Sequence, residues 1–196
     1  MRKSYGRNSV FNDFNLEILA DSIAAVTGRN GCGKTTLLRI IATLVGFEGG
    51  VVEVSGVSLQ LSGKVARALV SVGFPNQRGL FPNLKVGENL LALQSLGGGS
   101  DPAKCEFIRT MLGGMWDLWP HELSTGMRQM VHLSKTFLRH AEVYLFDEPF
   151  LSLDQVNVAK FYQMLSKLRA DQATVIISTQ AQDLGLLPAG TEIIHL

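Results

Sequence analysis

The chain has 196 residues, 46% of them hydrophobic, and a formal net charge of +1 at neutral pH. This length is typical of one globular domain with a sizeable core, and the charge argues against a nucleic-acid partner. No apolar run approaches the roughly 20 residues that cross a membrane, and no secretory signal precedes the first predicted strand. Two cysteines are too few for a disulfide framework or a zinc site.

The first 77 residues are predicted to be rich in short strands. Residues 5–20 alternate loosely and predict antiparallel strands, and residues 51–54 predict another. The short apolar runs at 22–27 and 70–74 are typical of buried core strands. Between them, apolar residues recur at helical spacing from 37 to 45, and Gly46 follows as a stop signal.

The middle of the chain is predicted to be helical and the end to alternate again. Helices are expected over 86–94, from Asp101-Pro102 onward, and over 127–138. Buried strands are expected at 143–146, 174–178 and 192–196, with a helix between the first two. The pattern predicts an α/β fold: a mostly parallel sheet with helices on both faces, an antiparallel N-terminal part, and an inserted helical subdomain. We expect a single domain, with a core of 1–77 and 135–196 and a helical subdomain of 78–134.

The strand at 22–27 leads into a glycine-rich loop that fits the pattern G-x-x-x-x-G-K-[ST]. Glycines let consecutive backbone N–H groups converge on phosphate oxygens, Lys34 supplies a positive charge, and the Thr35 hydroxyl is placed to bind Mg²⁺. A helix is predicted directly after the loop, so strand, loop and helix follow in the order that phosphate binding requires. The motif therefore predicts a nucleoside triphosphate, taken here to be ATP, and Mg²⁺ as the cofactors, bound by Gly28, Arg29, Asn30, Gly31, Cys32, Gly33, Lys34, Thr35 and Thr36.

Cys32 lies inside this loop and allows two interpretations. Its alkylation would block nucleotide binding, or it is a small filler at a variable position.

A second acidic element follows the apolar run at 143–146. Asp147 and Glu148 are expected at the carboxyl edge of the sheet, where α/β proteins bind ligands. Asp147 would bind Mg²⁺, and Glu148 would polarise the water that attacks the γ-phosphate. The alternative is that the pair only caps the next helix.

Further motifs resemble those of the ATP-binding cassette (ABC) ATPases. Residues 123–127, Leu-Ser-Thr-Gly-Met, resemble the family's signature, and residues 148–154 resemble the segment from the catalytic glutamate to the D-loop. Gln77, with residues 80–90, resembles the Q-loop, and Tyr5 falls where the family has an aromatic residue that stacks on adenine. The resemblance covers nearly the whole chain, with six motifs in the family's order.

This resemblance implies a partner and further site residues. Such domains work as head-to-tail pairs, identical or not, in the cytoplasm on the inner face of the membrane, where they drive a separate transmembrane permease subunit. Ser124 and Gly126 would contact the γ-phosphate bound to the other protomer, and Asp154 would couple the two sites. Gln77 would touch Mg²⁺ or the attacking water.

One departure from the family concerns catalysis. Where the family has a histidine after the strand at 174–178, this chain has Gln180, which can donate a hydrogen bond but cannot take up a proton or carry a positive charge. We expect slower hydrolysis, with Lys34, Gln77, Glu148 and Gln180 as the catalytic residues. The alternative is an impaired site that pairs with an active subunit.

The sequence alone does not decide the type of cassette or the role of two tryptophans. The short chain and its Ser-x-Gly-Met signature resemble export-type members, including the subunit for haem handling in cytochrome c maturation. A non-transport cassette that works through ATP-gated dimerisation is the rival, and a module in which ATP only locks a dimer is a third possibility. Trp116 and Trp119 either line a groove for a membrane subunit or pack in the core.

Overall fold

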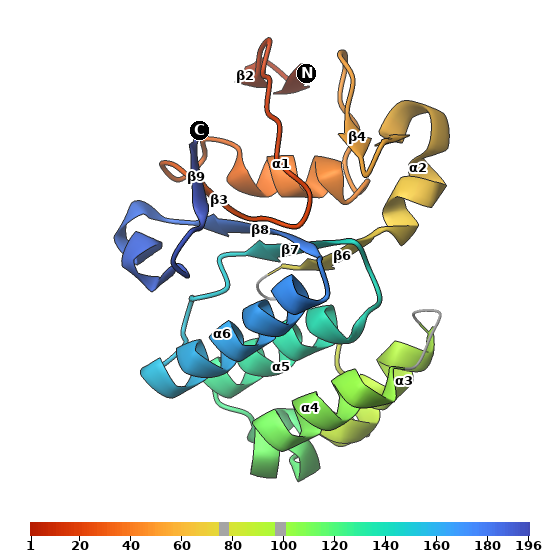
Figure 1. Ribbon diagram of the computed structural model, residues 1–196, viewed down its shortest axis with the longest axis vertical. Helices are drawn as coiled ribbons and strands as arrows, with labels where there is room; N and C mark the ends of the chain where they lie inside the picture. Colours follow the sequence, from red (N-terminus) through yellow and green to blue (C-terminus); the bar gives the residue numbers. More distant parts are fainter. Residues whose placement is uncertain (75–78, 97–100) are drawn as a thin grey trace.

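The computed structural model describes residues 1–74, 79–96 and 101–196. A five-stranded sheet lies at its centre in the order β6-β7-β8-β3-β9, and every neighbouring pair is parallel. The central strands are almost completely buried, as expected for a sheet covered on both faces (Figure 1). Their bounds are β3 Ile23–Thr27, β6 Val70–Gly73, β7 Val143–Asp147, β8 Thr174–Thr179 and β9 Glu192–His195. The predicted fold class is confirmed.

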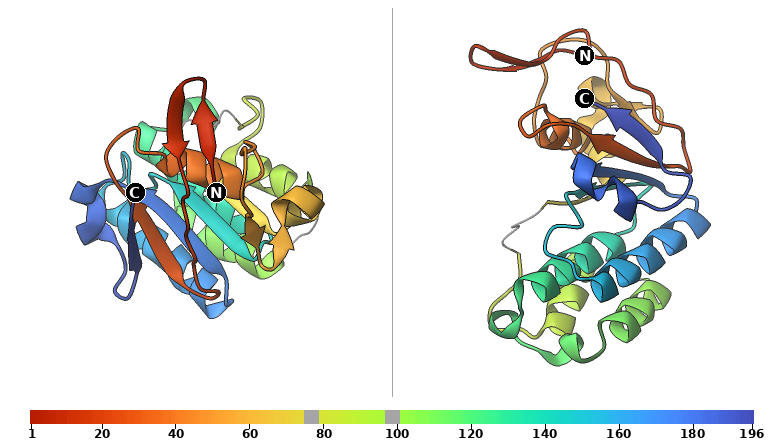
Figure 2. Two further views of the ribbon diagram at one scale, coloured as in Figure 1. Left: turned by 90° about the horizontal axis from the view of Figure 1, so that it is seen from above. Right: turned by 90° about the vertical axis from the view of Figure 1, so that its left-hand side faces the viewer.

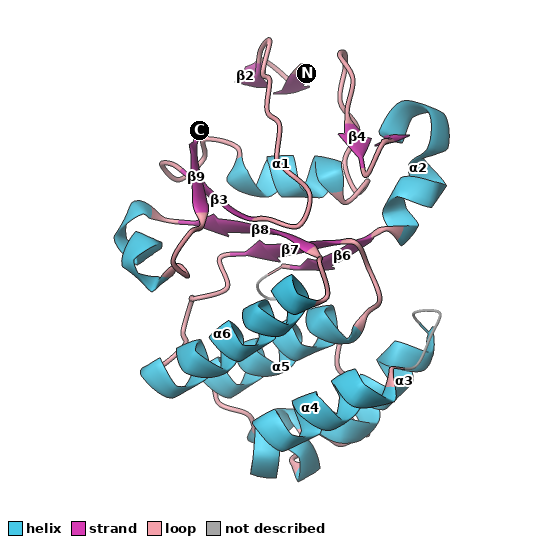
Figure 3. Cartoon of the chain, viewed as in Figure 1, coloured by secondary structure: helices cyan, strands magenta, loops and turns pink. Residues whose placement is uncertain are grey.

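One face of the sheet carries helix α1 and two small hairpins (Figure 3). Helix α1 packs on β7 and β8, and an apolar cluster that includes Leu38, Ile40 and Leu145 fills this interface. The N-terminal hairpin stands above α1 (Figure 2). The elements of this layer are β1 Lys3–Tyr5, β2 Asn8–Phe11, α1 Lys34–Ile41, β4 Glu53–Val54, β5 Val57–Ser58 and α2 Leu59–Ala68.

Three boundaries in this layer differ from prediction. Residues 12–22, all of which the structure describes, form no strand, so the antiparallel part is shorter than the predicted 5–20. The strand predicted at 51–54 is reduced to Glu53–Val54. Helix α1 ends at Ile41 rather than near residue 45, because Thr43 adopts a left-handed conformation, with φ +58°. Helix α2 was not predicted.

The other face is covered by helices. Helices α5 and α6 lie directly under the sheet, and α3 and α4 lie farther from it (Figures 1 and 2). Phe146 of the sheet packs edge-on against Phe161 of α6, at 5.1 Å between ring centroids. As predicted, Asp101 caps a helix that begins at Pro102: its Oδ1 accepts a hydrogen bond from the Lys104 backbone N–H at 3.0 Å. The elements are α3 Val86–Leu96, α4 Pro102–Leu112, η1 Gly113–Asp117, η2 Pro120–Glu122, α5 Thr125–Leu138 and α6 Gln155–Ala170. The short helix η3 Ala181–Leu186 lies beside the sheet, between β8 and β9 in the chain (Figure 1).

The two tryptophans differ in their surroundings. Trp116 packs against α3 so closely that a Cβ at Gly87 would lie 2.2 Å from its indole ring. Trp116 therefore fits the core-packing interpretation, whereas Trp119 is 37% exposed. Helix α5 runs unbroken across the predicted subdomain boundary at 134/135, and the division of the domain stays a prediction.

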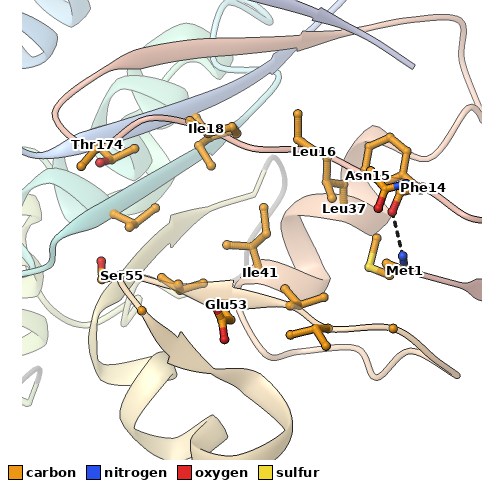
Figure 4. A pocket seen from close by; sticks show the side chains of 18 residues that line it. Met1, Phe14, Asn15, Leu16, Ile18, Leu37, Ile41, Glu53, Ser55 and Thr174 are labelled. Atoms are coloured by element: carbon orange, nitrogen blue, oxygen red, sulfur yellow. Dashed lines mark hydrogen bonds between the residues drawn. The ribbon is translucent and has the colours of Figure 1, made fainter.

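A cavity of about 660 Å³ opens between α1 and the segments 14–18 and 50–56 (Figure 4). Leu37 and Ile41 of α1 reach into it, and a hydrogen bond from the Met1 ammonium to the Phe14 carbonyl lies at one end. Among the residues that the structure describes, none of the predicted site residues lines this cavity. The described helices are all too short or too polar to cross a bilayer.

Candidate nucleotide-binding site

The glycine-rich loop joins the end of β3 to the start of α1. Gly33 immediately precedes the helix with φ +114°, a left-handed conformation that favours glycine. A Cβ on Gly33 would lie 2.7 Å from Val10 Cγ1 and 2.8 Å from Phe11 Cζ, so the N-terminal hairpin packs directly on the loop. The first turn of α1 leaves backbone N–H groups without helical partners, and such groups attract anions.

Lys34 is buried at the start of α1 and turns back over the loop. Its Nζ donates a hydrogen bond to the Gly28 carbonyl oxygen at 2.8 Å and lies 3.7 Å from Glu148 Oε1. The loop therefore holds a positive charge beside a carboxylate that comes from a distant part of the sequence.

Thr35 and Asp147 meet where α1 approaches the end of β7. The Thr35 hydroxyl lies 3.1 and 3.0 Å from the two carboxylate oxygens of Asp147. The Ser178 hydroxyl, from the neighbouring strand β8, donates to Asp147 Oδ1 and accepts a hydrogen bond from the Glu148 backbone N–H at 3.1 Å. The parallel register of β7 and β8, in which Asp147 lies opposite Ser178, creates this contact.

These oxygen atoms suit Mg²⁺. Mg²⁺ prefers oxygen ligands, and a threonine hydroxyl beside an aspartate is one of the ligand pairs that hold it when substrate phosphates supply the others. Within the described ranges there is no cluster of three His, Cys, Asp or Glu side chains that would form an all-protein metal cage. The residues present therefore fit a magnesium ion held jointly with a phosphate ligand.

Glu148 has an unusual backbone and an altered acidity. Its φ is +48°, and its backbone N–H also donates to the Ser178 carbonyl oxygen at 3.0 Å. Burial raises the pKa of the Glu148 carboxyl above its ordinary value, and the nearby charges of Asp147 and Asp183 raise this pKa further, while Lys34 opposes them. A carboxylate with a raised pKa next to a phosphate loop is suited to accept a proton.

The other predicted site residues lie on neighbouring elements. Ser124 caps α5, its Oγ accepting from the Met127 backbone N–H at 3.2 Å, and Asp154 caps α6 in the same way. Gly126 approaches the segment 148–154 so closely that a Cβ would lie 2.6 Å from the Ser152 carbonyl oxygen. Tyr5, on the hairpin above the loop, is 47% exposed.

The site is not complete in the described residues. Gln180 lies at the end of β8, where it is half-buried and precedes η3. Gln77 lies outside the described residues. Within the loop, Arg29, Asn30 and Gly31 are exposed, whereas Cys32 and Thr36 are half-buried.

The comparison with known families decides what this arrangement belongs to. A family model described as ABC transporter matches residues 11–151, which is most of the chain. The chain belongs to the ABC transporter family. A dimeric bacterial ABC transporter cassette of known structure superposes on all of it with a TM-score of 0.82 and 25% identity, covering 91% of that cassette. A structure of the same cassette in a post-hydrolysis state with ADP and Pi gives a TM-score of 0.81.

Curated relatives of this ABC cassette carry the names of importers. The Fe(3+) ions import ATP-binding protein FbpC of Serratia marcescens is 36% identical over 78% of the chain and 46% of its own length. The sulfate/thiosulfate import ATP-binding protein CysA of Caulobacter vibrioides is 33% identical over 95% of the chain and 57% of its own length. The chain thus spans about half the length of these relatives. Their names do not confirm the expected resemblance to export-type members.

Sequence reasoning missed two residues of this ABC cassette's site. Ser178 was read only as part of a buried strand, and its contacts with Asp147 and Glu148 depend on how β7 and β8 pair. Asp183, in the short helix η3 and 35 residues farther along the chain than Glu148, contributes through its negative charge. The signal available is indirect: Ser178 is the last residue of the strand predicted at 174–178, and Asp183 follows that strand by five residues.

Proposed function

We propose that this chain is the ATP-binding and ATP-hydrolysing subunit of an ABC transporter and powers a separate permease subunit. The observation that supports this most is the convergence of Lys34, Thr35, Asp147 and Glu148 at one edge of the sheet. These four side chains come from two segments more than 100 residues apart in the sequence. Together they provide a positive charge for phosphates, oxygen ligands for Mg²⁺ and a candidate base.

Each side chain then has a defined task. Lys34 exchanges its contact with the Gly28 carbonyl for the β- and γ-phosphates, and the N–H groups at the start of α1 add further donors. Thr35 and Asp147 would hold Mg²⁺, which would neutralise phosphate charge. Glu148 accepts the proton of the water whose oxygen attacks the γ-phosphorus, and ADP leaves.

We propose that the active unit is a pair of cassettes, either two copies of this chain or this chain with a related subunit. Ser124 and Gly126 lie at the N-terminus of α5, which would offer its N–H groups to the γ-phosphate bound by the other cassette. Asp154 would link the two sites, and Gln77 would contact Mg²⁺ or the water. The solved cassette that superposes on the chain is described as a dimer, which supports this arrangement.

The proposed assembly is cytoplasmic and lies on the inner face of the cell membrane, where the permease selects the cargo. Two directions of transport have separate support. The Ser-x-Gly-Met signature pattern favours export, including haem handling in cytochrome c maturation. The names of the curated relatives favour import.

Capture of the assembly from membranes tests the proposal. The Glu148→Gln variant, used to trap the closed pair, is expected to recover a multi-span membrane protein from gently solubilised membranes in the presence of Mg·ATP. The matched control is Glu142→Gln, which changes an exposed carboxyl at the other end of β7. Recovery of ribosomes or DNA-repair proteins without a permease would contradict the transporter proposal and favour the non-transport alternative.

We expect the Gln180→His variant to hydrolyse ATP faster than the wild type, by about tenfold, which corresponds to about 1.4 kcal/mol in the barrier. Histidine can carry a proton and a positive charge beside the γ-phosphate, whereas glutamine offers only a neutral donor. The measurement is phosphate release at saturating Mg·ATP. Gln182→His, at an exposed position two residues farther on, is the control and should leave the rate unchanged. An unchanged rate in Gln180→His would show that glutamine already serves this position.

A further inference from the structure

Lys3, at the start of β1, is buried to an extent that is rare for lysine. Its exposed fraction is only 8%, and lysines this buried almost always have a partner. Its Nζ lies 3.3 Å from Glu48 Oε1 and 4.7 Å from the centroid of the Tyr5 ring. The ammonium therefore makes an ion pair and a cation–π contact at the same time.

Glu48 belongs to the loop that follows α1, and it ties that loop to β1. Its Oε2 accepts a hydrogen bond from the Ser4 backbone N–H at 2.8 Å, and its own N–H donates to the Arg2 carbonyl oxygen at 3.0 Å. Arg2 in turn donates its N–H to the Gly49 carbonyl oxygen at 2.8 Å. The strand that carries Tyr5 is thus attached to the far end of α1.

The same hairpin is also held at the near end of α1. Strand β2 pairs with β1, and its Val10 and Phe11 pack against Gly33 in the phosphate loop. Tyr5 is therefore fixed relative to both ends of the helix whose N-terminus faces the phosphates. Lys3 lies over one side of the Tyr5 ring, so the exposed part of the ring is left to a ligand.

We propose that Lys3 and Glu48 are positioning residues that hold Tyr5 for stacking on the nucleobase. This inference rests on the proposed function, because it concerns the base of the same nucleotide. Lys3 fixes the orientation of the ring by its cation–π contact, and Glu48 fixes Lys3. Stacking on an aromatic ring is tolerant of base identity, so the pair favours nucleotides with a base over bare phosphate chains.

The test separates base binding from phosphate binding. Affinities are measured for Mg·ATP and for Mg·tripolyphosphate, which has the phosphates but no base. In the Lys3→Met variant we expect affinity for Mg·ATP to fall roughly 5- to 10-fold, the scale of a lost cation–π and stacking contribution. Affinity for Mg·tripolyphosphate should stay within about twofold, as for a substitution remote from the phosphates.

Three further variants make the test specific. Lys3→Arg keeps both contacts and should restore the affinity for Mg·ATP, while Glu48→Gln should lose part of it. Lys64→Met, at an exposed position on α2, should change neither affinity. Unfolding midpoints without nucleotide show that each variant is folded.

Four outcomes would overturn the inference. An equal loss for both ligands would mean that Lys3 acts on the phosphates or on the fold, and no loss would mean that Tyr5 is positioned without Lys3. A wild-type chain that binds tripolyphosphate as tightly as ATP would refute base stacking and leave the proposed phosphate binding intact. A wild-type chain that binds neither ligand would contradict the proposed function itself, and this inference with it.

Discussion

We expect the Glu148→Gln variant to hydrolyse ATP about 10²- to 10⁴-fold more slowly than the wild type while binding Mg·ATP as tightly. The amide has the shape of the carboxylate but accepts no proton from water at neutral pH. Lys34, Thr35 and Asp147, which are assigned to phosphate and Mg²⁺ binding, keep their places. The measurement is single-turnover phosphate release, with the binding affinity determined separately.

The pH dependence of ATP hydrolysis by the wild type tests the role of Glu148 as the base independently. Burial raises the pKa of the Glu148 carboxyl, so this base becomes ionised only at a pH above the usual glutamate range of about 4.3. The rate should therefore rise with pH through that raised pKa and should lose this rise in Glu148→Gln. Asp183→Asn removes a negative charge that raises the pKa and should move the rise to lower pH.

The stability of the folded protein should also depend on pH through the raised pKa of Glu148. A carboxyl whose pKa is raised in the folded state favours folding below its unfolded pKa and loses that contribution as the pH rises through the folded pKa. At neutral pH the wild type carries this cost and Glu148→Gln does not, so the variant should unfold at a higher temperature. The difference in unfolding temperature should vanish in acid, where the carboxyl is protonated.

The hydrolysis measurement can contradict the proposed role of Glu148. If Glu148→Gln hydrolyses ATP as fast as the Glu142→Gln control, another group is the base.

The buried strands were predictable because each signal is local. The apolar runs at 22–27, 143–146 and 174–178 agree with β3, β7 and β8 to within one residue at each end. Strands that are covered on both faces bury almost every side chain, so they are apolar throughout. The phosphate loop is local as well, since its glycines, lysine and threonine all lie within residues 28–36.

The remaining features depend on contacts that no short window contains. Leu44 and Val45 continue the apolar spacing of α1, yet their backbone N–H groups bond to the Arg39 carbonyl and close the helix instead. Helix α2 has a non-helical residue, Ser62 with φ −143°, which interrupts its periodicity. The contact of Ser178 with Asp147 required the pairing register of β7 and β8. The ion pair of Lys3 with Glu48 joins residues 45 positions apart.

We expect the Gly33→Ala variant to weaken Mg·ATP binding by roughly 10- to 100-fold and to lower the free energy of unfolding by about 2–4 kcal/mol. Two costs combine at this position. The φ of +114° is strained for any residue with a Cβ, and the new methyl group would lie 2.7 Å from Val10 Cγ1. A shift of the loop that relieves the backbone strain or the clash with Val10 would displace the backbone N–H groups assigned to phosphate binding. Affinity is measured by calorimetry and stability by denaturant unfolding.

Gly31→Ala separates these two costs. Gly31 also has a left-handed φ, +84°, but a Cβ there would meet no atom within 4 Å, so only backbone strain of about 1–2 kcal/mol is expected. Val10→Ala should recover part of the loss when it is combined with Gly33→Ala, since Val10 supplies the nearest atom. Equal losses in the two glycine variants, without recovery, would mean that backbone conformation alone sets the loop. Unequal losses with recovery would show that the N-terminal hairpin shapes the phosphate site by direct contact, through the same hairpin that carries Tyr5.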